Sequence, residues 1–340
     1  MRKSVAWLGV FLAAAFIVTL RGPAQSAEKF RFQLGWIPNA RHLFAYLADV
    51  GGLYQKQGLD VEFLRGAGGG DLVKKIGTGA AEAGENETIF NIEARARGVA
   101  LRVIAVIAEG GLTEVVVFKK SGIRRPKDLE GRTACDSATG LITTFPAFAA
   151  RNGIADWKVK TVAPALKTSS FLKGHCDFMV TFTTMAFIAE NEARKQGEEL
   201  VTLLYSDYGV DFYGTSLVAL DSVVRSKPDL IRRFVRASLQ GLEGSLADPK
   251  AAVDAFLKKN PTAKRFIVEN QWRIFTRHIV TPASKRDGLG WVDPKKMDEN
   301  IETMTRYMKL PKRVPAEEMY TNEFVVPKIY PPAAGRERKG

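Results

Sequence analysis

Short apolar runs alternate with amphipathic stretches along most of the chain. Runs such as FRFQL and LRVIAVIA are typical of buried strands, whereas apolar residues spaced three and four apart are typical of helices. Strands are predicted at 30–34, 59–64, 101–108, 113–119, 132–136, 158–162, 177–182, 200–204 and 215–220. Helices are predicted after Asn39, after Asp71, and at 87–97, 140–151, 168–173, 184–196, 228–247, 249–258, 261–278 and 294–307. This alternation predicts an α/β fold with parallel sheets.

Two helix starts carry capping signals. Asn39 precedes a stretch in which His42 and Tyr46 share one face, so Asn39 is expected to cap that helix. A glycine cluster at 66–70 leads to Asp71, which is expected to cap the next helix.

The order of strands and helices divides the chain into two similar α/β units. They are joined near 113–119 and again near 205–220, so the chain crosses over and returns. We therefore expect lobe I to comprise 28–115 and 213–327, and lobe II to comprise 116–212. Ligands of open α/β sheets bind beyond the carboxyl ends of the strands, which predicts a cleft between the lobes. The charged segment 328–340 is expected to be a flexible tail.

The N-terminal sequence predicts an export signal. A basic start is followed by 16 uncharged residues, Val5–Leu20, and then by small residues at Ala24, Ser26 and Ala27. We interpret residues 1–27 as a signal peptide and the mature protein as periplasmic, with cleavage after Ser26 or Ala27. The alternative is a retained membrane anchor, although 16 residues fall short of the roughly 20 that a span needs.

Composition and charge narrow the class of protein. The chain is 46% hydrophobic and 26% charged, which is typical of a folded globular protein. Its net charge of +13 admits nucleic acid, a membrane surface or a small anion as partner. The basic residues are scattered and form no basic–aromatic stripe, so nucleic acid is not expected as a partner. We expect a monomer.

Signatures of common enzymes are absent from the sequence. There are only three histidines, and no HExxH, CxxC or GxSxG occurs. The stretch 77–82 is an incomplete GxGxxG that ends in glutamate. The sequence therefore predicts a protein that is not an enzyme, with no cofactor and no metal. A secreted enzyme whose Ser, His and Asp meet only in space is the alternative.

The two cysteines, Cys135 and Cys176, are placed near the end of one predicted strand and before the start of another. If those strands are parallel neighbours, four residues of about 3.3 Å each separate the thiols. That distance exceeds the roughly 7 Å limit for the two Cα atoms of a disulfide. We therefore predict two free, buried thiols.

Six stretches, in order, carry a resemblance to a known family. They are LGWIPN at 34–39, GLYQKQGLDV at 52–61, the glycine cluster with 76–77 and 83–84, SGIRRPKDLEG at 121–131, FLKGHCD at 171–177 and YGVDFY at 208–213. Together they resemble the periplasmic substrate-binding proteins of ABC importers, in the subgroup that binds sulfonates, nitrate and thiamine pyrimidine precursors. The resemblance implies a two-lobed type II periplasmic binding protein fold, with C-terminal helices and hinge closure on a small-molecule solute. It also implies an ABC permease of the inner membrane as partner.

Lobe I offers six candidate ligand-binding residues at its strand and helix ends. Trp36 follows the first strand, where its ring stacks on a flat ligand or simply packs. Asn39 and its helix start suit an anion or a carbonyl, and His42 either donates to the ligand or is solvated. The other candidates are Gly70, where bare backbone approaches a ligand, and Asn86 and Glu87, which follow the third strand.

Lobe II and the second crossover supply four more candidates. Ser137 and Thr139 start the matching helix of lobe II, either as ligand contacts or as an ordinary cap. Asp211 and Tyr213 lie where the chain returns to lobe I. The WxPN start and YGVxxY segment look most like the binders of thiamine pyrimidine precursors. Relatives of that kind often carry an acid after a lobe II strand, where this chain has TTMAF at 183–187. The expected solute is thus such an aromatic heterocycle, or a small anion.

Overall fold

The computed structural model describes residues 27–137 and 140–332. Nearly all of the predicted signal peptide, together with Thr139 and residues 333–340, lies outside these described residues. Within the described part of the chain, no helix is both long enough and apolar enough to span a bilayer.

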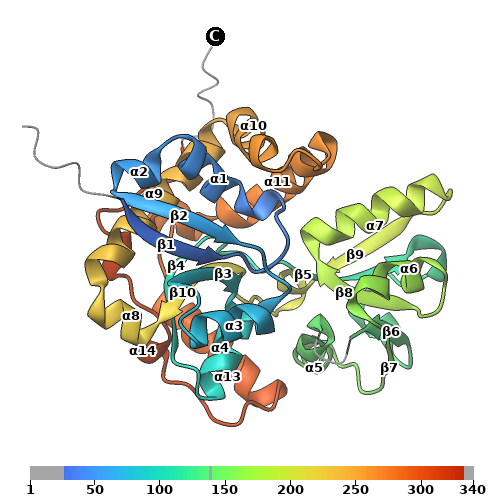
Figure 1. Cartoon of the computed structure of the whole chain (residues 1–340). Helices are drawn as coiled ribbons and strands as arrows, with labels where there is room; N and C mark the ends of the chain where they lie inside the picture. Colours follow the sequence, from blue (N-terminus) through green and yellow to red (C-terminus); the bar gives the residue numbers. More distant parts are fainter. Residues whose placement is uncertain (1–26, 138–139, 333–340) are drawn as a thin grey trace, which may run out of the picture.

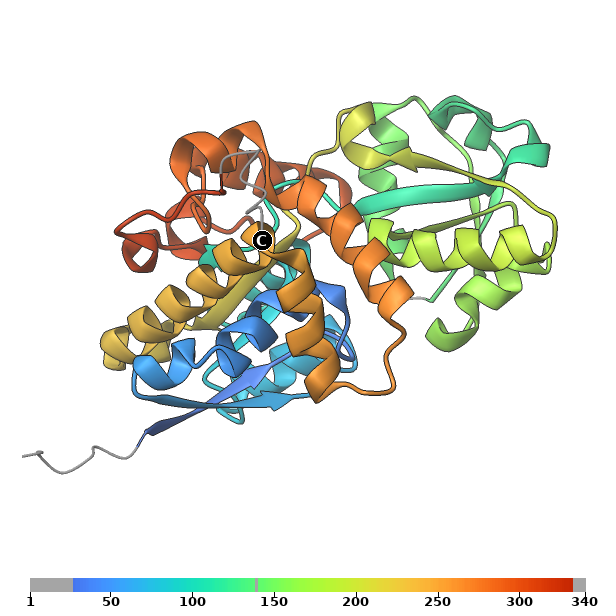
Figure 2. The ribbon, with the colours of Figure 1, turned by 90° about the horizontal axis from the view of Figure 1, so that it is seen from above.

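Two five-stranded sheets lie in two lobes that sit side by side (Figures 1 and 2). The first sheet has the order β2-β1-β3-β10-β4 and the second β7-β6-β8-β5-β9. The first contains β1 (Glu28–Gln33), β2 (Leu59–Leu64), β3 (Ala83–Glu87), β4 (Leu101–Val106) and β10 (Thr215–Leu220). The second contains β5 (Thr113–Phe118), β6 (Thr133–Asp136), β7 (Lys158–Thr161), β8 (Phe178–Phe182) and β9 (Leu200–Leu204). The α/β class and the two-lobed architecture are confirmed.

The expectation of purely parallel sheets is wrong, because each sheet holds one strand that runs the other way. Strand β5 is antiparallel to β8 and β9, and its first residue pairs with the last residue of β8, Thr113 with Phe182. Strand β10 is antiparallel to β3 and β4, and Thr215 pairs with Glu87 at the end of β3. Both crossovers therefore enter a sheet at its carboxyl edge, and the entering strand must run away from that edge.

Most helices cover the first sheet. They are α1 (Leu43–Val50), α2 (Leu53–Lys56), α3 (Gly69–Gly77), α4 (Thr88–Ala96), α8 (Asp221–Ser226), α9 (Pro228–Ala247), α10 (Pro249–Lys259), α11 (Arg265–Ile279), α12 (Pro282–Asp287), α13 (Pro294–Tyr307) and α14 (Ala316–Met319). The second sheet is covered by α5 (Phe145–Arg151), α6 (Lys167–Leu172) and α7 (Thr183–Lys195). Helix α11 extends from lobe I to lie along α7 of lobe II (Figure 2), and the Gln271 side chain donates to the carbonyl of Thr184.

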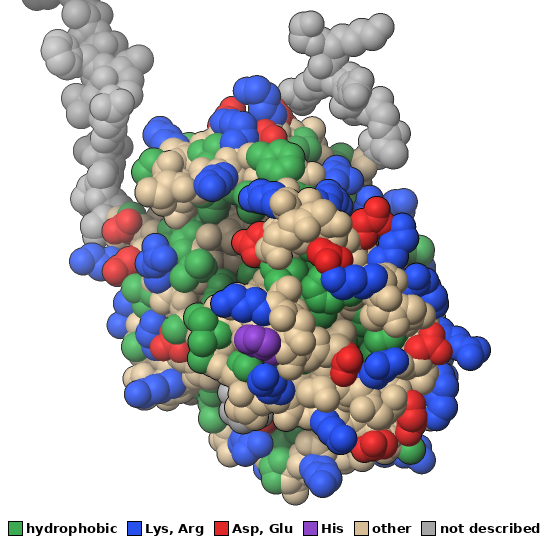
Figure 3. Space-filling view, turned by 90° about the vertical axis from the view of Figure 1, so that its right-hand side faces the viewer, with side chains coloured by type: hydrophobic (Ala, Val, Ile, Leu, Met, Phe, Trp, Pro, Cys, Tyr) green, Lys and Arg blue, Asp and Glu red, His purple; other side chains and the backbone are tan. Residues whose placement is uncertain are grey.

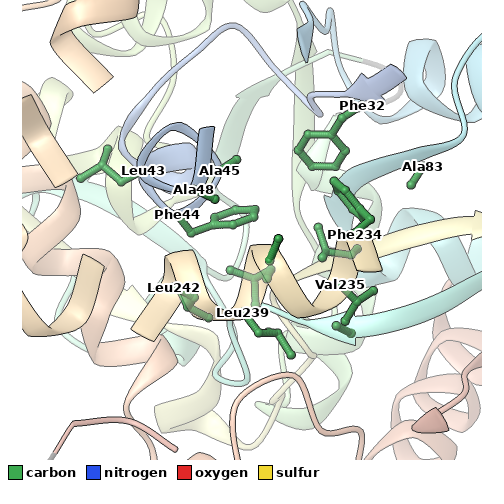
Figure 4. Packing of buried hydrophobic residues seen from close by; sticks show 14 of the residues in the cluster. Phe32, Leu43, Phe44, Ala45, Ala48, Ala83, Phe234, Val235, Leu239 and Leu242 are labelled. Carbon is green, nitrogen blue, oxygen red and sulfur yellow. The ribbon is translucent and has the colours of Figure 1, made fainter. Parts of the chain in front are cut away.

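The core of lobe I is densest where α1 and α9 pack on the first sheet (Figure 4). The ring of Phe234 on α9 lies 5.0 Å from that of Phe32 on β1. Gly241 of α9 faces α1 so closely that a Cβ there would stand 2.2 Å from the carbonyl oxygen of Phe44. Only glycine permits this approach, which brings the large apolar side chains of both helices into contact.

The prediction of two free thiols is wrong, because Cys135 and Cys176 form a disulfide whose Cα atoms are 5.6 Å apart. The prediction treated the residues before β8 as extended strand. The chain instead bends at 175–177, so Cys176 is folded back over β6 rather than displaced along it.

The predicted flexible tail begins too early at Lys328. Ile329 is buried, and its carbonyl accepts the N–H of Leu289 at 2.7 Å. The ammonium of Lys328 lies 4.3 Å from the ring centroid of Trp291. The buried Ile329 side chain, this backbone bond and the Lys328–Trp291 contact together place the segment on lobe I.

Candidate ligand-binding site between the lobes

The carboxyl edges of the two sheets face each other. Arg41 follows β1 in a short 3₁₀ turn, Ala40–His42, and its guanidinium lies 5.5 Å from the ring centroid of Phe182 at the end of β8. The amide of Thr183 donates to the carbonyl of Leu112 in the first crossover at 2.9 Å. The site is therefore bounded by the ends of β1 and β3 in lobe I and of β6 and β8 in lobe II.

Trp36 has the most accessible large ring at this edge. It is 37% exposed, whereas Trp272 in the core of lobe I is 2% exposed. Its ring lies 3.5 Å from the position that a Cβ on Gly68 would occupy, so one side of the ring packs against the glycine backbone. The neighbouring Ile37 is 48% exposed. An indole supported on one side and open on the other is suited to stacking on a planar ligand.

Asn39 acts as the predicted helix cap. Its side chain accepts the amide of Arg41 at 3.0 Å and donates to the carbonyl of Ile37 at 2.9 Å. These bonds fix the turn that carries Arg41 toward lobe II, so the local sequence positions the guanidinium.

His42 is fully buried, so neither of the two roles considered for it fits. Its Nδ1 accepts the amide of Asn39 at 3.2 Å, which leaves the proton on Nε2. Nε2 lies 3.0 Å from Oε2 of Glu85, whose side chain is also fully buried. The buried ring therefore supports the buried Glu85 carboxylate beneath the strand ends.

Two buried carboxylates lie beneath these strand ends. Glu87 pairs with Arg41 and accepts the hydroxyl of Thr215 at 3.1 Å. Burial raises the pKa of Glu87 to about 7 even though the Arg41 charge opposes the shift. Burial acts in the same direction on Glu85, but Arg41 and the bonds from His42 and Gly35 outweigh it and hold its pKa below the usual range.

The glycine-rich loop has two parts with different roles. A Cβ on Gly66 would stand 2.0 Å from the carbonyl oxygen of Leu34, so this glycine is needed for packing. Gly70, in the first turn of α3, has nothing within 4 Å of the corresponding point and is exposed. The N-cap of α3 is Gly68 rather than the predicted Asp71, which instead accepts the amide of Ala67 at 3.2 Å.

The side chains of Asn86 and Glu87 are buried in lobe I. Asn86 is 3% exposed, and its amide donates to Oδ1 of Asn91 at 3.0 Å. The position of Asn86 and Glu87 at the end of a strand predicts ligand contacts. Their side chains are instead satisfied within lobe I, so they hold the strand end in place.

In lobe II, Asp136 organises the loop that carries Ser137. The buried Asp136 carboxylate accepts the amides of Ser137 at 2.7 Å and Ile142 at 2.9 Å, and Lys167 lies 3.4 Å away. Burial raises the pKa of Asp136, and the Lys167 charge and the two amide bonds counteract part of that effect. Ser137 is half-buried at the carboxyl end of β6, on the edge that faces lobe I.

Asp211 and Tyr213 lie in the second crossover. Tyr213 is buried, and its hydroxyl oxygen accepts the amide of Asp293 at 2.8 Å. Asp211 is bound by the ammonium of Lys296 at 2.6 Å. Both residues therefore belong to the connection between the lobes, where the Asp211 side chain is exposed and that of Tyr213 is buried.

Sequence reasoning missed Arg41, Phe182 and Lys167. The acidic pair in the strand sequence AGENE offered a signal, because two carboxylates in a fully buried strand require positive partners. Among residues 27–137 and 140–332, no group of three or more His, Cys, Asp and Glu side chains is placed to hold a metal ion. On the face of the molecule in Figure 3, basic and acidic side chains are interspersed.

Two α/β lobes joined by two crossovers, with facing carboxyl edges, define the type II periplasmic binding protein fold. The profile of the family described as NMT1/THI5 like matches residues 39–252, and the chain belongs to this family.

Similar proteins include both binders and enzymes. The formylaminopyrimidine-binding protein of Halalkalibacterium halodurans is 20% identical over 338 residues, 94% of this chain and 99% of its own. The 4-amino-5-hydroxymethyl-2-methylpyrimidine phosphate synthase THI13 of Saccharomyces cerevisiae is 24% identical over 263 residues, 73% of this chain and 76% of its own. The periplasmic aliphatic sulphonate binding protein SsuA of Escherichia coli shares the fold, with 14% identity, a TM-score of 0.68 and coverage of 86% and 91% of the two chains.

Proposed function

We propose that this protein is the periplasmic solute-binding component of an ABC importer. It captures a small organic solute by closing its two lobes and delivers it to a permease in the inner membrane. The observation that carries this proposal is the exposed indole of Trp36, which leans on Gly68 at the edge that faces lobe II. The fold and the names of the binding proteins among its relatives support it.

An aromatic heterocycle, such as a thiamine pyrimidine precursor, is the solute we favour. A planar ring matches Trp36, and the two basic groups at the facing edges, Arg41 and Lys167, already have carboxylate partners in Glu87 and Asp136. A small anion is the second candidate, because Gly70 is exposed in the first turn of α3, where backbone amides favour negative charge.

The experiment is to identify the solute and then remove the ring. Mass spectrometry of native purified protein names the bound molecule, and thermal shift with aminopyrimidines, flavins, sulfonates and carboxylates ranks the classes. Trp36→Ala is expected to weaken binding of the best ligand at least tenfold by calorimetry, on the order of 1.4 kcal/mol or more. Tyr330→Ala removes another exposed ring, 46% exposed, and should leave affinity unchanged. Equal affinity in both variants would contradict the site.

We also propose that the protein is not an enzyme. Some relatives are named as synthases, so a secreted enzyme on this scaffold is the alternative. Incubating the identified solute with the protein and following it by mass spectrometry separates the two, because a binding protein returns the solute unchanged.

Export and oligomeric state complete the proposal. We infer that the signal peptide is cleaved after Ser26 or Ala27 on export, so N-terminal sequencing of the exported protein should begin at Ala27 or Glu28. Light scattering of the purified protein should give the mass of a monomer. A membrane-bound protein that keeps Met1 would contradict the signal peptide.

A further inference from the structure

Two short segments connect the lobes, between β4 and β5 and between β9 and β10. They comprise residues 107–112 and 205–214. If the lobes close on a ligand, as the proposed function requires, the backbone dihedrals of these two segments must absorb the rotation. A side chain that immobilises part of a segment therefore determines about which residues the lobes rotate.

Lys296 on α13 joins both segments to lobe I. Its ammonium donates to the carbonyl of Glu109 at 2.9 Å and to the Glu109 carboxylate at 2.7 Å in the first segment. It also binds the Asp211 carboxylate at 2.6 Å in the second segment, and lies 4.9 Å from the ring centroid of Tyr213. The side chains of Lys296 and Glu109 are 15% and 18% exposed, so their bond is shielded from water, whereas the Asp211 side chain is 47% exposed.

Asn300, one turn further along α13, uses its side chain to bind backbone groups of the second segment. Its Oδ1 accepts the amide of Tyr213 at 2.7 Å, and its Nδ2 donates to the carbonyl of Asp211 at 3.0 Å. The oxygen and the nitrogen of the side-chain amide thus bind two residues of the same crossover, and this fixes the peptide groups between those residues.

The two segments are also bound to each other and to α11. Oδ1 of Asp211 accepts the amide of Gly111 at 3.2 Å, and the amide of Gly214 donates to the carbonyl of Ala108 at 3.1 Å. A Cβ on Gly214 would stand 2.8 Å from the carbonyl oxygen of Gly110, so the segments touch backbone to backbone. The amide of Gly110 donates to the carbonyl of His278 at 2.9 Å.

We propose that Lys296 and Asn300 are positioning residues for the cleft, which act through the crossovers and touch no ligand. They hold Glu109 and the stretch Asp211–Tyr213 as part of lobe I. Gly110 and Gly111 are held as well, through His278 and Asp211, so the rotation is confined to the lobe II side, to residues 112 and 205–210, where Gly209 has a left-handed φ of +80°. This confinement gives the lobes a defined axis, so Trp36 and the lobe II edge meet in one orientation.

The test measures the distance between the lobes without any ligand. Spin labels are attached at Lys258→Cys on α10 and Lys195→Cys on α7, both exposed, under non-reducing conditions that preserve the disulfide. Lys296→Met is expected to widen the distance distribution about twofold, and Lys296→Arg to restore it because the charge returns. Lys295→Met is the matched control, since this neighbour on α13 is 87% exposed and pairs with Glu299 one turn along the same helix.

Hydrogen exchange gives a second readout in the same proteins. The amides of Gly111 and Tyr213 are expected to exchange about tenfold faster in Lys296→Met and in the isosteric Asp211→Asn, and at the unaltered rate in Lys295→Met. A lower melting temperature with an unchanged distance distribution and unchanged exchange would overturn the proposal, because it would show a purely structural role. The distances are measured without solute, so failure of the proposed function is recognised separately, by the absence of any bound solute.

Discussion

The guanidinium of Arg41 in lobe I lies 5.5 Å from the ring centroid of Phe182 in lobe II. Arg41 also pairs with the buried Glu87, so one side chain links a buried carboxylate of lobe I to the end of the central strand of lobe II. A cation over an aromatic ring contributes about 0.5–2 kcal/mol, depending on how far both groups are removed from water.

Removing this guanidinium should destabilise the protein strongly. Arg41→Met leaves Glu87 buried without its partner, and the free energy of unfolding is expected to fall by about 3–5 kcal/mol. The double variant Arg41→Met/Glu87→Gln should recover part of that loss, because the unpaired carboxylate of Glu87 is gone while Glu85 keeps only His42 as its side-chain partner among the described residues. Urea denaturation of the four proteins in the cycle measures the coupling, and additive losses would show that the two residues act independently.

Two glycines of the same loop should respond oppositely to an added methyl group. Gly66→Ala drives a Cβ to within 2.0 Å of the Leu34 carbonyl oxygen, so a loss of about 1–3 kcal/mol is expected. Gly70→Ala meets open space and should change stability by less than about 1 kcal/mol. Melting temperatures compare the two, and the ligand affinity of Gly70→Ala reports whether bare backbone is needed there. Equal melting temperatures would refute the packing role of Gly66.

Glu114 on β5 should make stability depend on pH. Burial, together with the nearby charges of Glu190 and Asp207, raises its pKa to about 8. The unfolded chain releases this proton near pH 4.5, so between about pH 4.5 and 8 the folded state holds more protons, and its stability falls as pH rises. Glu114→Gln should flatten that slope and raise the melting temperature more at pH 8 than at pH 5.

The control for this prediction is Glu199→Gln, in the same lobe, whose exposed carboxylate pairs with Lys119. It should keep the wild-type pH slope. If the stability of Glu114→Gln fell with pH as steeply as that of the wild type, the pH dependence would come from other groups.

The disulfide of lobe II should contribute measurably to stability. Cys135 and Cys176 are 41 residues apart in sequence, and loss of a native bridge typically costs about 2–5 kcal/mol. Calorimetry should show a lower melting temperature for Cys135→Ser/Cys176→Ser. Dithiothreitol should lower the wild-type value and leave the variant unchanged. Two titratable thiols in unreduced, denatured protein would contradict the bridge.

Sequence reasoning identified the exposed residues at the candidate site better than the buried ones beneath them. Trp36 and the Asn39 cap are local features that follow directly from the end of a strand and the start of a helix. His42, Asn86 and Glu87 are polar residues at the same strand and helix ends, yet they are buried and bonded to Glu85, Asn91 and Arg41 respectively. Residue type and position alone do not distinguish a polar side chain that faces a ligand from one that supports it.

The sequence by itself determined where the elements lie, because caps and periodicity act within a few residues. Helices α9 and α13 occupy the predicted ranges 228–247 and 294–307. Only the tertiary structure decided the reversed direction of β5 and β10, the disulfide and the bonds of Lys296 to both crossovers. Each of these depends on segments that are distant in sequence and become neighbours only when the chain crosses between two lobes and returns.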